Sequence, residues 1–176
     1  MLYPLKKLVR YLSFLWSAKW LWSWPQKADI LIFDGCGEEL LREYLEGWTL
    51  GVLPVRGESI NLPVLFVTLL APGNRSDAYY DVYVKAVKPK LMLTFIDTTL
   101  AFYRFSRRHP EVETMFIQNG LRTFYGVFDR LEELGQLNNN LAVDHMMCFG
   151  KAIARKYQQY LSGSATVMGS LRNNRE

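Results

Sequence analysis

The sequence contains few of the residues that build disulfide frameworks or metal centres. Its 176 residues include two cysteines, Cys36 and Cys148, and two histidines, His109 and His145. No CxxC or Cys/His spacing occurs, and neither histidine has a ligand partner at a spacing typical of metal sites. This composition predicts neither a disulfide scaffold nor a bound metal, and it favours a reducing cytoplasm.

Long apolar runs and a strong excess of one charge are also missing. Lys6, Lys7, Arg10 and Lys19 interrupt the apolar N-terminus, so no run approaches the ~20 residues that a membrane-spanning helix needs. No small-residue cleavage site of a signal peptide follows. The 21 basic and 17 acidic residues give a net charge of +4, which predicts no nucleic-acid partner. With 49% apolar residues, the chain is expected to fold.

Residues 1–25 are predicted to form an amphipathic helix that ends at Pro25. Four of the five tryptophans lie in this segment, and its polar stripe follows a +4, +3, +4 spacing at Lys6, Arg10, Ser13 and Ser17. Tryptophan favours the headgroup boundary and basic side chains attract anionic lipid. We therefore expect residues 2–24 to lie on an anionic membrane surface. The alternative is a helix packed on the domain or on a partner protein.

From residue 26 onward, short apolar runs alternate with segments of helical periodicity. The runs predicted to be strands cover residues 28–33, 48–53, 91–96, 114–117, 143–149 and 165–168. The segments predicted to be helices cover residues 38–45, 62–70, 77–87, 98–108 and 151–160. This alternation predicts that residues 26–176 form a Rossmann-like α/β domain, in which a mostly parallel sheet has helices on both faces.

Polar residues follow each predicted strand, where ligands of open parallel sheets bind. We expect these residues to face one cleft. They are Asp34, Gly35, Cys36 and Gly37; Arg56 and Glu58; Asp97, Thr98 and Thr99; Gln118, Asn119, Gly120 and Arg122; and Gly169 and Ser170. Asn61, the expected N-cap of the helix over residues 62–70, is also included among the substrate-binding candidates.

Two readings stay open for the first of these turns. Asp34-Gly-Cys-Gly could receive an anion at a helix N-terminus, or it could be a tight turn that needs small residues. The full GxGxxG fingerprint of a dinucleotide site is absent. Cys36 is interpreted as an ordinary small thiol, since no histidine is spaced to activate it.

The other strand exits allow alternatives as well. Asp97 could serve as a general base toward a hydroxyl, or it could cap the helix that Thr98 begins. Asn119 and Gly120 are turn formers, which favours a structural role. Arg56 with Glu58 is either a salt-bridged loop or a clamp for a phosphate or sugar.

The linear order of these motifs resembles that of a known family. The segments are ADILIFDGCGEELL, VLPVRGESINLPVL, KPKLMLTFIDTTLAFYRF, MFIQNGLR, VDHMMCFGKAIARKY and VMGSLRNN. Together they span about Ala28 to Asn174 and resemble the surface carbohydrate biosynthesis protein family, which is similar to glycosyltransferases of the two-domain GT-B fold.

The resemblance implies a cytoplasmic enzyme that uses a nucleotide sugar to build lipopolysaccharide or capsule. With the N-terminal segment on a membrane surface, this enzyme would be peripheral on the inner face of the cytoplasmic membrane. This chain would be the acceptor-side half, with a separate polypeptide supplying the C-terminal donor domain. Transfer would be inverting and would need no metal or cofactor. Asp97 would deprotonate the glycan acceptor, while Arg56 and Arg122 would orient anionic groups. The alternative is a non-catalytic, membrane-associated interaction module or a truncated remnant.

Overall fold

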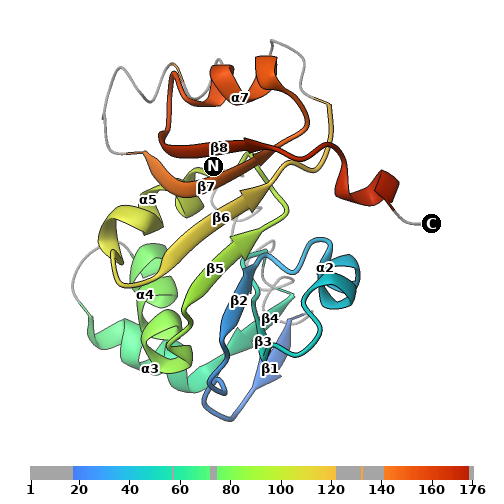
Figure 1. Ribbon diagram of the computed structural model, residues 1–176. Helices are drawn as coiled ribbons and strands as arrows, with labels where there is room; N and C mark the ends of the chain where they lie inside the picture. The colour runs from blue at the N-terminus through green and yellow to red at the C-terminus, as the bar shows by residue number, and fades with distance from the viewer. Residues whose placement is uncertain (1–17, 57, 72–74, 122–131, 133–140, 175–176) are drawn as a thin grey trace, which may run out of the picture.

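The computed structural model describes residues 18–56, 58–71, 75–121, 132 and 141–174. Its main element is a six-stranded sheet of order β3-β2-β5-β6-β7-β8, in which every neighbouring pair is parallel (Figure 1). The strands are β2 (Ile30–Phe33), β3 (Leu50–Leu53), β5 (Leu91–Thr94), β6 (Glu113–Ile117), β7 (Ala142–Cys148) and β8 (Ser162–Val167). The predicted parallel α/β fold and its six strands are confirmed.

Helices cover both faces of this sheet. Consecutive residues of a strand point to opposite sides, so each face presents its own set of apolar side chains for helices to pack on. Leu31 and Phe33 of β2 pack with α4 (Arg75–Val87), α5 (Leu100–Arg108) and α7 (Lys151–Tyr157). Ile30 and Ile32 pack on the other side with α2 (Glu38–Tyr44) and the 3₁₀ helix η1 (Leu171–Asn174). The central strands β2 and β5 are apolar on both sides, as expected for a parallel sheet covered by two helical layers, whereas the edge strand β8 is mostly exposed.

Aromatic rings fill the larger of the two cores. Phe33 meets Phe102 edge to face with ring centroids 5.5 Å apart, and Phe116 lies 4.9 Å from Tyr157. Such pairs contribute about 1 kcal/mol each beyond the burial of their area. These contacts fix α5 and α7 against the sheet near the ends of β2 and β6.

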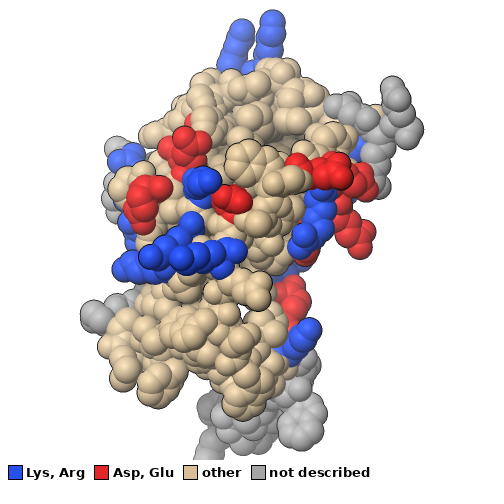
Figure 2. Space-filling view, turned by 60° about the horizontal axis from the view of Figure 1, so that its bottom comes forward, with Lys and Arg blue, Asp and Glu red and all other residues tan. Residues whose placement is uncertain are grey.

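A second, two-stranded sheet lies beyond β3 and was not predicted. It pairs β1 (Lys19–Leu21) with β4 (Ser59–Asn61) in parallel, and Trp20 is opposite Ile60. Helix α3 (Leu62–Leu70) follows β4 directly. Figure 2 shows an almost uncharged lobe over this small sheet and α3, below a band of Lys and Arg side chains.

The predicted N-terminal helix is therefore wrong where the structure describes it, because residues 19–21 form a strand. Tryptophan is favoured in strands, and the partner strand lies about forty residues further along the chain, where helical periodicity cannot detect it. The prediction for residues 1–17 lies outside the described residues. Among the described residues, no helix has the length and apolar character to cross a membrane.

Candidate functional site

The strand order of the main sheet has its topological switch point between β2 and β5. Helix α2, which follows β2, packs on one face of the sheet, while α5, which follows β5, packs on the other. The loops at residues 34–37 and 95–99 therefore leave the same edge in opposite directions. Ligands of open α/β sheets bind at such a switch point, so we take the β2/β5 crevice as the candidate site.

The loop after β2 has an unusual backbone. Asp34, Gly35 and Gly37 all have positive φ angles, of 80°, 63° and 73°. A side chain on Gly37 would place its Cβ 3.0 Å from the Phe95 ring, and one on Gly35 would come within 3.2 Å of Val52. These glycines are required for the tight strand-to-helix turn. Asp34 carries a Cβ atom, so its positive φ is sterically unfavourable and costs on the order of 1 kcal/mol.

The Asp34 side chain is almost completely buried but is held by an exposed partner. Its carboxylate accepts a hydrogen bond from Arg56 Nε at 2.8 Å. The Asp34 side chain is 7% exposed, whereas that of Arg56 is 58% exposed. Burial raises the pKa of Asp34 above its usual range, and the pair with Arg56 offsets this only in part. Arg56 therefore pairs with Asp34, whereas the sequence had suggested Glu58 as its partner. Its alternative role as a clamp for a phosphate or sugar stays a prediction.

Asp97 lies at the same edge but its side chain turns inward. The residue is fully buried, and its carboxylate accepts a 2.5 Å hydrogen bond from the Tyr157 hydroxyl of α7. The hydroxyl of Tyr103 donates to its backbone carbonyl at 2.6 Å. The N-cap of α5 is Thr99, so the alternative of Asp97 as the cap is wrong. Its role as general base stays a prediction.

The residues after β6 connect neighbouring loops. Gln118 is buried, and its amide accepts from the Phe149 backbone and donates to the Gly120 carbonyl, both at 2.8 Å. This side chain therefore bridges the loops after β6 and β7. Asn119 and Gly120 are partly exposed beside it. Arg122 lies outside the described residues.

Two further candidates belong to the small sheet. Asn61 caps α3 by accepting from Val64 N at 3.1 Å, as predicted, and its side-chain amide donates to the Ser23 carbonyl at 2.8 Å. Asn61 is 2% exposed, so these contacts occupy its side chain. Glu58 is exposed, and its carbonyl accepts from Lys19 N. A substrate-binding role for either residue stays a prediction.

A pocket of about 320 Å³ opens next to the Gly37 turn and includes residues that sequence reasoning missed. It is lined by Gly37, Glu39, Leu40 and Arg172. The Arg172 guanidinium comes from η1 and lies 5.4 Å from the centre of the Phe95 ring. The volume is near the lower limit for small-molecule sites. The position of Arg172 shortly after the last strand could have indicated a place in the site. From the sequence, only Gly169 and Ser170 were expected there.

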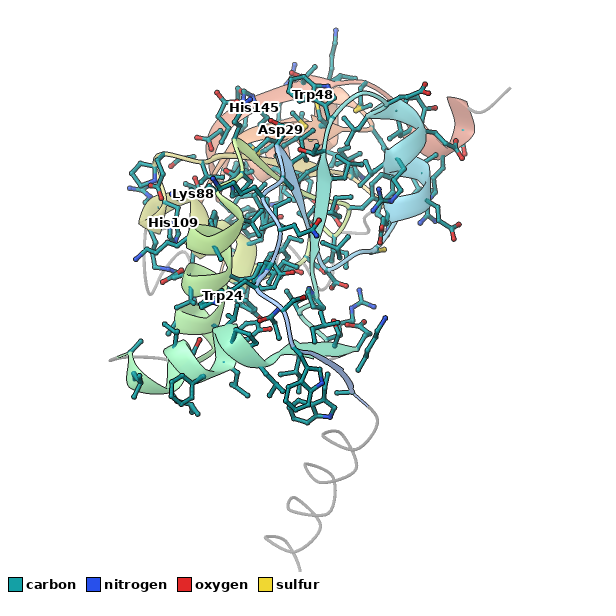
Figure 3. The ribbon with its side chains drawn as sticks, turned by 90° about the horizontal axis from the view of Figure 1, so that it is seen from below. Trp24, Asp29, Trp48, Lys88, His109 and His145 are labelled. Carbon is teal, nitrogen blue, oxygen red and sulfur yellow. The ribbon has the colours of Figure 1, made fainter. Side chains whose placement is uncertain are left out.

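Cysteine and histidine chemistry has little support at this edge. Burial and the charge of Asp97 raise the pKa of Cys148 to about 11, so its reactive thiolate is rare at neutral pH. His109 contacts Asp81 and Glu111, each at 2.9 Å, away from the crevice. In Figure 3 the two histidines lie apart from each other, with His109 at the end of α5 and His145 on β7. Within the described residues, no three His, Cys, Asp or Glu side chains are grouped to hold a metal ion.

The fold and this edge define a doubly wound α/β protein with a polar switch-point crevice. Residues 115–176, from β6 to the end of the chain, match the model of a family described as "putative O-antigen biosynthesis protein". The match covers less than half of the chain and supports a role in surface carbohydrate biosynthesis. No curated protein and no solved structure matches the chain.

Proposed function

We propose that this chain binds a sugar-containing substrate at the β2/β5 crevice, as the acceptor-side half of a glycosyltransferase that uses a nucleotide sugar. The observation that supports this most is the arrangement around the Gly37 turn. Asp34 and Arg56 form an ion pair on one side of the turn, and Arg172 lines the pocket on the other. Carboxylates accept hydrogen bonds from sugar hydroxyls, and guanidinium groups bind phosphate in bidentate geometry.

The family match adds the biological context. It includes the segment that carries Gln118, Asn119 and Arg172, and it supports surface polysaccharide synthesis. Nucleotide-sugar use and a separate donor-domain polypeptide come from the resemblance of the sequence motifs, and a peripheral position on the inner membrane face comes from the composition of the N-terminal segment. All three belong to this proposal.

Calorimetric titration with sugar phosphates, used as fragments of a phosphate-bearing acceptor, tests the binding site, because the nucleotide sugar itself would be held by the donor domain. The unaltered chain is expected to bind, and Arg56→Gln and Arg172→Gln should each weaken binding about tenfold, because a hydrogen bond to a charged group contributes about 1.5–3 kcal/mol. Arg42→Gln is the matched control, since Arg42 is exposed on α2 and pairs with Glu38 outside the pocket. Absence of binding, or equal losses in all three variants, would contradict the proposal.

A second candidate function is a non-catalytic interaction module, and the burial of Asp97 favours it. A general base must reach the proton that it removes, whereas this carboxylate is fully buried and bonded to Tyr157. Turnover by the chain with a donor-domain partner should vanish in folded Asp97→Asn if Asp97 is the base. Full turnover in that variant would eliminate the base, and no turnover by the unaltered pair would favour the module.

A further inference from the structure

Large apolar side chains are exposed on the small sheet and α3. They form what we call the apolar face, defined by Trp20, Trp22, Trp24, Phe66, Val67 and Leu70. Trp22, Leu70 and Phe66 are 80%, 75% and 66% exposed. Contact of such large apolar side chains with water is unfavourable, and their burial against an apolar partner would remove it. Exposure of six together marks a surface that binds something apolar.

The fold holds the two segments of this face together. Trp20 pairs with Ile60 in the small sheet, and the Asn61 side chain both caps α3 and donates to the Ser23 carbonyl between Trp22 and Trp24. Asn61 therefore places the tryptophans at the start of α3. The nearly buried Asn61 therefore links the two segments of the apolar face.

Helix α3 presents its apolar residues outward. Its buried residues are Val64 and Thr68, one turn apart, and the Thr68 hydroxyl donates to the Val64 carbonyl at 2.7 Å. Phe66, Val67 and Leu70 point away from the domain core and are exposed. A helix of nine residues is about 14 Å long, which is too short to cross a bilayer but long enough to lie in its headgroup region.

Charge distinguishes a lipid surface from a protein partner. Residues 1–28 contain no aspartate or glutamate, and residues 59–76 contain none either. Lys19 and Lys27 are exposed beside the tryptophans, and Figure 2 shows the lobe as almost uncharged. Protein interfaces are depleted in lysine, whereas tryptophan, leucine and lysine without carboxylates are typical of surfaces that bind anionic lipid.

We propose that the apolar face docks on an anionic phospholipid bilayer and that α3 inserts Phe66 and Leu70 below the headgroups. The inference rests on the membrane attachment in the proposed function but not on sugar binding. Helix α3 would be a second membrane-binding element, besides the N-terminal segment that the sequence had indicated. Asn61 would hold the parts of the apolar face together.

Co-sedimentation of the full chain with vesicles tests the inference. Vesicles of phosphatidylcholine with phosphatidylglycerol should pellet the chain, more weakly at high salt, and pure phosphatidylcholine should pellet less of it. The double variant Phe66→Ser/Leu70→Ser keeps residues 1–17 and should lose at least about tenfold in vesicle partitioning, given the apolar area removed. Leu121→Ser is the control, because Leu121 is 89% exposed outside the face.

The outcomes separate lipid from other occupants. Equal partitioning of the double variant and the unaltered chain would overturn the proposal, as would a stable dimer of the lipid-free chain that the double variant abolishes. Circular dichroism shows whether the variant is folded, which is expected since both side chains are exposed. Binding of the sugar phosphates should be unchanged in the double variant, so failure here is distinguishable from failure of the proposed sugar site.

Discussion

Strand β2 has an aspartate at each end, and the protein holds the two side chains in different ways. Asp29, before the strand, accepts hydrogen bonds from Thr49 and Lys90 and is partly exposed. These bonds, above all that from the Thr49 hydroxyl, lower the pKa of Asp29 to about 2. Asp34, after the strand, is buried in a left-handed turn, and its pKa is raised by that burial.

The contrast between Asp29 and Asp34 distinguishes the two edges of the sheet. The amino edge has a structural role, and the carboxyl edge is the one proposed to bind a ligand. At the amino edge the polar groups of Asp29, Thr49 and Lys90 are joined to each other and stabilise the pairing of β2 with its neighbours. At the carboxyl edge, backbone strain and a buried carboxylate oppose folding. Backbone strain and carboxylates that are buried at a cost to folding are concentrated at functional sites. This combination occurs at Asp34 and not at Asp29, which supports the ligand site proposed at the carboxyl edge.

The largest expected effect comes from the Gly37 turn. Gly37→Ala would combine a left-handed φ of 73° with a Cβ 3.0 Å from Phe95, and we expect a loss of about 2–3 kcal/mol in the free energy of unfolding. Gly47→Ala at the other end of α2 is the control. Its φ is 89°, but no described atom lies within 4 Å of the new Cβ, so about 1 kcal/mol is expected. Urea denaturation measures both, and equal losses would refute a packing role for Gly37.

The next effect concerns the third aspartate, Asp97. Tyr157→Phe removes a donor to its buried carboxylate and should cost about 2 kcal/mol of unfolding free energy. Tyr103→Phe removes a donor to the neutral carbonyl of the same residue and should cost about 1 kcal/mol. Thermal unfolding of the two variants compares them directly. A larger loss in Tyr103→Phe would contradict the assignment of the charged contact to Tyr157.

Much of the main sheet could be predicted from the sequence because its signals are local. Apolar runs such as residues 30–33 and 91–94, followed by polar turns, mark buried parallel strands. The parallel order then places Asp34 and Asp97 at one edge. The N-cap at Asn61 could also be predicted from a local signal, because an asparagine precedes an apolar helix with proline in its first turn.

The remaining features depend on contacts between distant segments. The pairing of Lys19–Leu21 with β4 leaves no periodic signal in either short strand. The side-chain direction of Asp97 depends on Tyr157, sixty residues away, so strand-exit position alone could not show that the carboxylate is buried. Arg172 joins the pocket only because η1 packs against the face that carries α2.

A smaller effect is the opposite pH response of the two aspartates of β2. The raised pKa of Asp34 means that its charging opposes folding, so stability falls as pH rises through the window above 3.8. Asp34→Asn should therefore gain stability relative to the unaltered protein across that window. The lowered pKa of Asp29 stabilises the fold above pH 3.8, and this is lost as pH falls toward 2. Asp29→Asn should therefore lose stability relative to the unaltered protein as pH rises from about 2 to above 3.8.

Urea denaturation midpoints between pH 2 and pH 6 give both differences. Changes of the same sign in the two variants would show that the ends of β2 are electrostatically alike, and the comparison between a structural and a binding edge would then fail.

The smallest effect distinguishes the two partners of Asp29. The Thr49 hydroxyl contributes most to the low pKa of Asp29, ahead of Lys90, whose side chain is 76% exposed. Thr49→Ala should therefore move this pKa further toward 3.8 than Lys90→Met does, because water and salt screen the exposed ammonium group. Carboxyl-carbon NMR titration of Asp29 reads both shifts. If Lys90→Met gave the larger shift, the amino edge would depend on surface charge rather than on hydrogen bonds, and it would respond to salt as a surface pair does.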